Sequence, residues 1–204
     1  MPAGKKFLVT GFGRTGSHWV ADNAAAVLKM ESGDILFDVE KWAESESGLL
    51  HTNETKSLID LDESIRANCI MLWARRKDIF TRTISLYVAR HSNEWYVYSN
   101  RLVRPFSIDP TEFIEQLESH EHLTMMMLAR VLPLYPDVRT IWYEDMVRYK
   151  HVAGYYVAKI MDLPYEEPAV YYSEKKNLRN YSDIVENYHE LKYLYDLRLS
   201  ERYK

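Results

Sequence analysis

The chain has 204 residues, of which 47% are hydrophobic and 27% are charged, as is typical of a folded globular protein. Its formal net charge is −4 and no basic stripe stands out, so we expect no nucleic-acid partner. The single cysteine, Cys69, excludes an internal disulfide and a cysteine-cluster metal site. No apolar run is long enough to span a membrane, and the start, MPAGKK, does not resemble a signal peptide. We therefore expect a cytoplasmic protein with no membrane partner.

Short apolar runs alternate with longer amphipathic stretches along the chain. Strands are expected at 6–11, 47–53, 69–76 and 138–145, with a further short strand within 31–38. Helices are expected at 17–30, 78–91, 109–135, 147–163 and 182–199. This alternation predicts an α/β protein with a central parallel sheet flanked by helices. We expect one domain over 1–204, with a core at about 5–165 and a helical C-terminal tail at 166–204.

Polar residues follow each apolar strand at its carboxyl end. In an open parallel sheet these ends meet at one edge, where ligands bind. We therefore expect four segments to share one crevice: 11–18, 51–54, 75–78 and 143–145.

The segment FLVTGFGRTGSHW has the glycine spacing of a phosphate-binding loop, with Gly11 and Gly16 separated by four residues and followed by a helix. Glycines let successive backbone N–H groups converge on one anion, and the helix N-terminus adds about half a positive charge. Arg14 adds a full charge. In nucleotide hydrolases a lysine and then Ser or Thr follow the last glycine, whereas here Ser17 and His18 follow. The loop keeps an anion cradle but lacks the phosphate lysine and the magnesium hydroxyl.

A second basic segment, WARRKDIFTRTISLY, follows the third expected strand. Arg75 and Arg76 lie at the strand end, and Ser85 is expected on the next helix, on the same face as Arg82. Two arginines and a hydroxyl near one crevice can hold a second phosphate. A bound anion would also offset the unfavourable placement of basic residues at a helix N-terminus.

In four segments, taken in order, the chain resembles the sulfotransferases that use 3′-phosphoadenosine-5′-phosphosulfate (PAPS). VTGFGRTGSHWV is similar to the family's 5′-phosphosulfate loop, and LLHTNE lies where the family has a strand ending in a Lys-Thr-His-like triplet. IMLWARRKDIFTRTISLY resembles the 3′-phosphate motif, and TIWYEDMV resembles the Tyr-Glu-Asp segment after the fourth core strand. The resemblance spans about residues 5–165, is closer to the bacterial and carbohydrate-type branches, and implies a P-loop-type three-layer fold.

The resemblance assigns residues to both ends of the nucleotide. It places Arg75 and Ser85 on the 3′-phosphate, with Arg76 as a substitute for Arg75, and Tyr143 near the adenosine. The family's basic, glycine-bearing C-terminal loop has one candidate here, EKKNLRNY, which lacks the glycine and offers Lys175, Lys176 and Arg179. The residues expected at the 5′-phosphosulfate are Gly13, Arg14, Thr15, Gly16, Ser17, His18 and Trp19.

The reaction implied is in-line transfer of a sulfuryl group to a hydroxyl or amine, without a metal and with PAP as the product. It needs alignment and stabilisation of charge on the leaving phosphate, which Arg14 and the loop N–H groups would supply. His51, at a strand end facing the crevice, is the first candidate for the base that deprotonates the acceptor. Glu54 is the next candidate, followed by Glu40 and Glu44. His18 is expected to protonate or orient the leaving group.

Several alternatives stay open. A P-loop nucleotide or small-molecule kinase would need the lysine and magnesium ligands that this loop lacks, and a non-catalytic protein would bind PAP without turnover. Glu144 and Asp145 either cap the next helix or brace Arg14 or Arg75. The acceptor is an unidentified small molecule or carbohydrate, with the aromatic segment 95–106 as a candidate wall, and a homodimer is left open.

Overall fold

A computed structural model describes residues 5–31, 34–93, 103–148, 152–164 and 180–202. The chain divides into two compact units, which are treated separately below. The first comprises Met1–Lys77 and Leu123–Tyr172, and the second comprises Asp78–His122 and Ser173–Lys204. The expectation of a single domain stays a prediction.

The first unit is built on a four-stranded parallel sheet with the strand order β2-β1-β3-β4, as the α/β fold class predicted. Its strands are β1 (Lys6–Thr10), β2 (Gly48–His51), β3 (Cys69–Arg75) and β4 (Asp137–Trp142). In register, Val9 pairs with His51, and Arg75 pairs with Trp142. All four strands point the same way, so their carboxyl ends lie along one edge, as expected.

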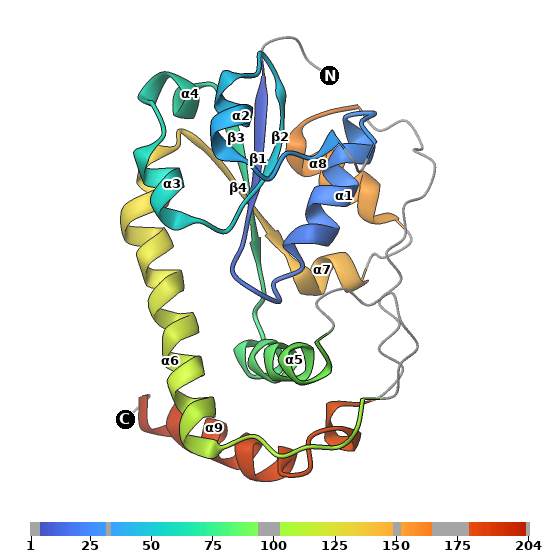
Figure 1. Cartoon of the computed structure of the whole chain (residues 1–204), viewed down its shortest axis with the longest axis vertical. Coiled ribbons are helices and arrows are strands. Elements are labelled where there is room, and N and C mark those ends of the chain that lie inside the picture. The colour runs from blue at the N-terminus through green and yellow to red at the C-terminus, as the bar shows by residue number, and fades with distance from the viewer. Residues whose placement is uncertain (1–4, 32–33, 94–102, 149–151, 165–179, 203–204) are drawn as a thin grey trace. The chain divides into compact units, whose positions relative to one another are not determined.

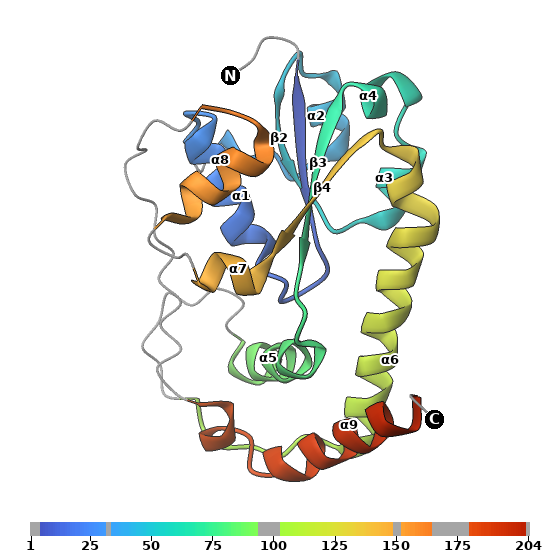
Figure 2. The same ribbon diagram turned by 180° about the vertical axis from the view of Figure 1, so that it is seen from behind.

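Helices cover both faces of this sheet (Figures 1 and 2). On one side lie α1 (Ser17–Val27), α7 (Tyr143–Arg148) and α8 (Ala153–Met161), and on the other lie α2 (Val39–Glu44), α3 (Thr55–Asp60) and α4 (Glu63–Ala67). Successive strand residues point to opposite faces of the sheet. Val9 packs in one core cluster with residues of α1, whereas Leu8 and Trp73 pack in another with Trp42 of α2. The near-continuous apolar strands are therefore explained by burial on both faces.

A buried lysine ties the amino end of β1 to the end of α2. Lys6 is 8% exposed, and its ammonium donates to the backbone oxygens of Trp42, Ala43 and Ser45 at 2.5, 3.1 and 2.5 Å. These carbonyls lie at the carboxyl end of α2, where a positive charge complements the helix dipole. Burial lowers the pKa of Lys6. The dipoles of these carbonyl groups thus stabilise the positive charge of the buried Lys6 ammonium.

The second unit contains α5 (Ile79–Ser92), most of α6 (Pro110–Met126), the short 3₁₀ turn η5 (Tyr181–Asp183) and α9 (Tyr188–Arg202). Its core consists of Phe80, Ile84, Phe113, Leu117 and Leu191 with their neighbours. The helix expected over 109–135 continues beyond α6 as η2 (Met127–Val131), which has π-helical bonding, and the 3₁₀ turn η3 (Leu132–Leu134). Pro133 at the start of η3 explains the break, because proline lacks the N–H that an α-helix needs.

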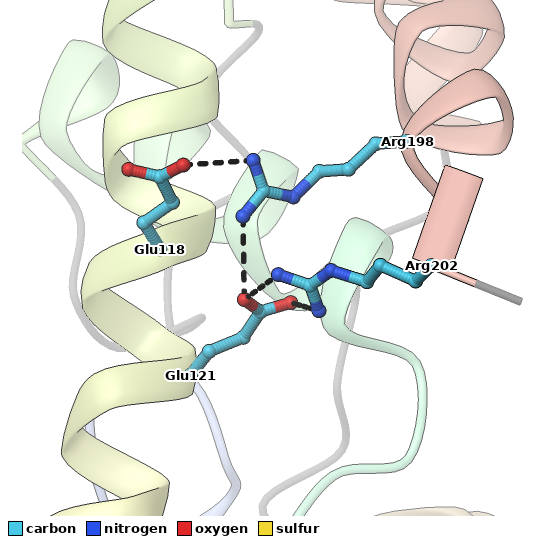
Figure 3. Close-up of polar contacts among 4 residues, drawn as sticks. All are labelled: Glu118, Glu121, Arg198 and Arg202. Carbon is cyan, nitrogen blue, oxygen red and sulfur yellow. Dashed lines mark hydrogen bonds and ion pairs between the residues drawn. The ribbon is translucent and has the colours of Figure 1, made fainter. Parts of the chain in front are cut away.

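Within this unit, an ionic cluster joins α6 to α9 (Figure 3). Glu121 accepts from both Arg198, at 3.5 Å, and Arg202, at 2.5 Å, and Arg198 also donates to Glu118 at 2.8 Å. Glu121 is therefore the central acceptor, and its side chain is 26% exposed.

Three expectations need correction. The helix expected at 147–163 is two helices, α7 and α8, and α7 already begins at Tyr143 because Glu144 and Asp145 suit a first helical turn. The strand expected within 31–38 is only an isolated bridge between Leu36 and Leu50. The last helix begins at Tyr188, later than expected. In the described ranges, no helix has both the length and the apolarity to cross a membrane.

Candidate anion-binding site

The glycine-rich loop leads from β1 into α1. Residues 11–16 connect Thr10 to Ser17, and the N–H of Thr15 donates to the carbonyl of Phe12 at 3.2 Å. Gly16 precedes the helix, has no side chain to cap it, and is followed by a first turn without an acidic residue. The partial positive charge of the helix start is therefore not offset by a side-chain cap or a carboxylate of its own first turn. Such a helix start favours an anion.

Two residues of this loop have left-handed backbone conformations. Arg14 has φ 67° and Gly16 has φ 81°. For arginine this conformation costs about 1 kcal/mol, and strain of this kind concentrates at ligand-binding sites. Gly16 is also required by its neighbour, since an ideal Cβ there would lie 2.7 Å from Cδ2 of Tyr143. The loop is thus packed directly against the first residue after β4.

Two imidazoles lie beside the start of α1. Nε2 of His51 is 2.9 Å from Oγ of Ser17, and both residues are buried. The ring of His18 lies edge-on to His51, with the centroids 4.2 Å apart. Within the described part of the chain, Nδ1 of His51 is buried and has no hydrogen-bond partner. Phe37, which is 62% exposed, has its ring centroid 5.7 Å from that of His51.

Burial favours the neutral form of both imidazoles. It lowers the pKa of His51 to about 3, with a smaller contribution from the charge of His18, and it lowers the pKa of His18, with a smaller contribution from Arg14. A neutral imidazole keeps one nitrogen that can accept a proton. An anion bound at the loop would raise these pKa values, because a nearby negative charge favours the imidazolium.

Arg75, the last residue of β3, contacts two tryptophan rings. Its guanidinium carbon is 4.2 Å from the ring centroid of Trp73 and 4.5 Å from that of Trp142. Burial lowers the pKa of Arg75. Among the described residues its guanidinium makes these ring contacts and no hydrogen bond or ion pair. Both are cation–π contacts, and they leave the hydrogen-bond donors of the guanidinium without an acceptor in the described ranges, so an oxyanion can accept from them.

Arg76 is held by the next aromatic residue, Tyr143. The guanidinium carbon lies 4.5 Å from the Tyr143 ring centroid, and the buried Nε has no hydrogen-bond partner in the described ranges. The same ring lies against Gly16 and 6.3 Å from the Trp19 ring. Successive side chains at a strand end point to opposite faces, so Arg76 lies on the α1 side and Arg75 on the α2 side. The two guanidinium groups thus contact different aromatic rings, and the expectation that Arg76 substitutes for Arg75 stays a prediction.

Two carboxylates at this edge have structural contacts. Glu144 Oε1 accepts from the backbone N–H of Lys77 at 2.9 Å, which joins the end of β3 to the start of α7. Asp145 Oδ2 accepts from the Tyr156 hydroxyl at 3.3 Å. These contacts hold in place the segments just after β3 and β4, next to Arg75 and Tyr143.

The other acidic candidates lie at the surface. Glu54 is exposed at the start of α3, where it accepts from Ser57 at 2.9 Å, and Glu40 and Glu44 are exposed on α2. Over the residues that the structure describes, no group of three or more His, Cys, Asp or Glu side chains is arranged to hold a metal ion.

The remaining expected residues lie in the second unit or outside the described residues. Ser85 and Arg82 are buried on α5 in the second unit, so the expected pairing of Ser85 with Arg75 stays a prediction. Lys175, Lys176 and Arg179 lie outside the described residues, as does most of the segment 95–106.

Sequence reasoning missed the two tryptophans. Trp73 lies two residues before Arg75 on the same strand, and Trp142 is the residue that pairs with Arg75 in β4. The period of two in β-strands was a usable signal for Trp73. The contact with Trp142 required the register of two strands more than 60 residues apart, which the sequence does not provide.

No family model matches the chain, and no curated protein matches its sequence. Among solved structures, the chain is similar to a mouse sulfotransferase, SULT7A1, complexed with PAP, at 12% identity and a TM-score of 0.48. The alignment covers 80% of this chain and 61% of the mouse chain. At this similarity the likeness carries no inference about function, which has to come from the site itself.

Proposed function

We propose that the protein is a sulfotransferase that moves a sulfuryl group from PAPS to a hydroxyl or amine. The observation that carries the proposal is the carboxyl edge of the sheet, where a strained glycine loop opens a helix and two guanidinium groups are held on aromatic rings. An anion is the ligand that suits this arrangement. Two separate basic positions suit a ligand with two anionic groups, as a nucleotide with phosphates at both ribose ends has.

The loop is unsuited to a magnesium nucleotide. Ser17 occupies the position of the phosphate lysine, and its hydroxyl contacts His51 at 2.9 Å and is buried. His18 occupies the position of the magnesium hydroxyl. A sulfuryl group carries less negative charge than a terminal phosphoryl group, so its transfer has less need of a bridging cation. This favours the sulfotransferase over the kinase that the glycine spacing alone allows.

In the proposed reaction the acceptor oxygen or nitrogen forms a bond to sulfur as the bond from sulfur to the phosphate oxygen breaks. The N–H groups at the start of α1 and the Arg14 guanidinium would stabilise the charge that develops on the leaving phosphate. The acceptor proton would pass to a neutral imidazole. His51 is the first candidate, and His18, which is less buried, is the second.

Calorimetry with PAP tests the proposal, using the wild type, Arg14→Ala and Arg75→Ala. We expect wild-type binding and a loss of roughly 10- to 100-fold in each variant, the range for a hydrogen bond to a charged group. A transfer assay with labelled PAPS and a panel of acceptors, with and without EDTA, then tests turnover. Absence of PAP binding in the wild type would refute the proposal. No transfer from PAPS, together with phosphoryl transfer from a magnesium nucleotide that EDTA abolishes, would favour the kinase.

A second function is favoured by one observation. His51 is 4% exposed and its pKa is lowered to about 3, so in the absence of ligand it is a weak base. A protein that binds PAP without turnover would have the same site. PAP binding together with no transfer to any acceptor in the panel would support this second function.

A further inference from the structure

We propose that Arg76 provides the positive charge that the loop lacks in place of a lysine, by binding the same anion as residues 11–16. The proposal rests on the proposed function in one respect: it identifies this anion as the 5′-phosphosulfate end of PAPS. It gives Arg76 and Arg75 different ligand groups, whereas the resemblance placed Arg75 on the 3′-phosphate with Arg76 as its substitute.

The position of Arg76 follows from the strand geometry. Arg75 pairs with Trp142 at the end of β3 and β4, and the next residues, Arg76 and Tyr143, continue this pairing as a ring contact of 4.5 Å. Tyr143 in turn lies so close to Gly16 that an added Cβ would be 2.7 Å from its ring. A single aromatic ring therefore contacts both Arg76 and the residue that opens α1.

The hydrogen bonding of Arg76 supports a missing ligand. Its Nε is buried and without a partner in the described part of the chain, and no carboxylate there pairs with its guanidinium. Buried donors without partners are rare, because leaving one unsatisfied costs free energy. Two further buried polar atoms near the loop have no partner among the described residues: Oγ1 of Thr15 and Nδ1 of His51. An anion at the start of α1 would supply an acceptor for Nε of Arg76.

Arg75 provides a matched control. It has the same side chain, is adjacent in sequence and is also held on aromatic rings, but it lies on the other face of the sheet with Trp73. Arg75→Gln and Arg76→Gln therefore remove the same charge and the same donors from two faces. The experiment compares adenosine 5′-phosphate, adenosine 3′-phosphate and PAP by calorimetry with each variant.

Arg76→Gln is expected to weaken adenosine 5′-phosphate and PAP by roughly 10- to 100-fold and to leave adenosine 3′-phosphate unchanged. Arg75→Gln is expected to weaken adenosine 3′-phosphate and PAP and to leave adenosine 5′-phosphate unchanged. Arg76→Lys, which keeps the charge but not the planar fork, should recover part of the affinity. Unchanged binding of adenosine 5′-phosphate by Arg76→Gln would overturn the inference.

Inorganic sulfate separates this inference from the proposed function. Sulfate is expected to raise the thermal unfolding temperature of the wild type, and this rise should shrink in Arg76→Gln and in Arg14→Ala. If both residues bind one anion, the two losses will not add in the double variant. Non-additive losses in a protein that binds no nucleotide would support the role of Arg76 while refuting the proposed function. Additive losses, or no effect of Arg76→Gln on the sulfate response, would refute the role of Arg76.

Discussion

Replacing Gly16 with alanine tests how tightly the loop is built against Tyr143. The added Cβ would lie 2.7 Å from Cδ2 and 3.4 Å from Cε2 of the Tyr143 ring, and the backbone has φ 81°. The left-handed conformation costs alanine about 1–2 kcal/mol, and forcing the ring aside costs a further 1–3 kcal/mol or so, as in other overpacked sites. We expect Gly16→Ala to lower the free energy of unfolding by about 2–5 kcal/mol.

Urea unfolding in two backgrounds separates the two costs. In Tyr143→Ala the ring is absent, so Gly16→Ala should cost only the backbone contribution, about 1–2 kcal/mol. The difference between the backgrounds is the steric coupling of Gly16 with Tyr143. Gly13→Ala is the matched control, because Gly13 is exposed and its φ is not in the positive range. An equal cost of Gly16→Ala in both backgrounds would refute the packing described here.

Three further predictions concern stability. Burial lowers the pKa of His51 and of His120 to about 3, so between about pH 6.5 and pH 3 each imidazole binds fewer protons in the folded protein than in the unfolded chain. The stability that the two neutral imidazoles contribute is therefore fully present above about pH 6.5 and is lost as the pH falls toward 3. In a pH series of urea unfolding curves His51→Asn should reduce the slope over this range by about 1.4 kcal/mol per pH unit, and an unchanged slope would contradict the assignment. Lys6→Met should lower the free energy of unfolding by about 2–3 kcal/mol, because it removes the donors to the carbonyls at the end of α2. The control Lys5→Met, at an exposed position, should have little effect. Equal effects of the two variants in thermal unfolding would disprove the role of Lys6. Glu121→Gln should lower the free energy of unfolding by only about 0.5–1 kcal/mol, because the ionic cluster is partly exposed. Salt at about 1 M should remove most of the difference in stability between the variant and the wild type. A larger loss of stability that persists in salt would show that the cluster is more than a surface network.

The strands of the first unit were predictable because burial on both faces leaves a nearly continuous apolar run. Val9, Leu50 and Leu72 each lie in such a run, and the glycines or polar residues that follow mark where each strand ends. Helix boundaries were less accurate. The apparent continuation of β4 through Tyr143 is helical, because the pattern of aromatic and acidic residues there fits a strand end and a first helical turn equally well.

The candidate site was predictable in its members but not in its contacts. Glycine spacing identified the loop, and strand ends identified His51 and Arg75. The contact of Ser17 with His51, and the separation of Arg76 from Arg75, depend on which face each residue occupies at the edge of the sheet. A one-residue change in register would exchange these faces, and the sequence does not fix the register between distant strands.

The contact of Arg75 with two indoles has an optical consequence. Tryptophan emission responds to charge close to the ring, and both Trp73 and Trp142 lie within 4.5 Å of one guanidinium carbon. An oxyanion that docks on the edge of this cation would partly neutralise it and so change the local field at both chromophores. The protein thus contains an intrinsic fluorescent reporter at one of the two places where we expect its ligand, and titrations need no added dye.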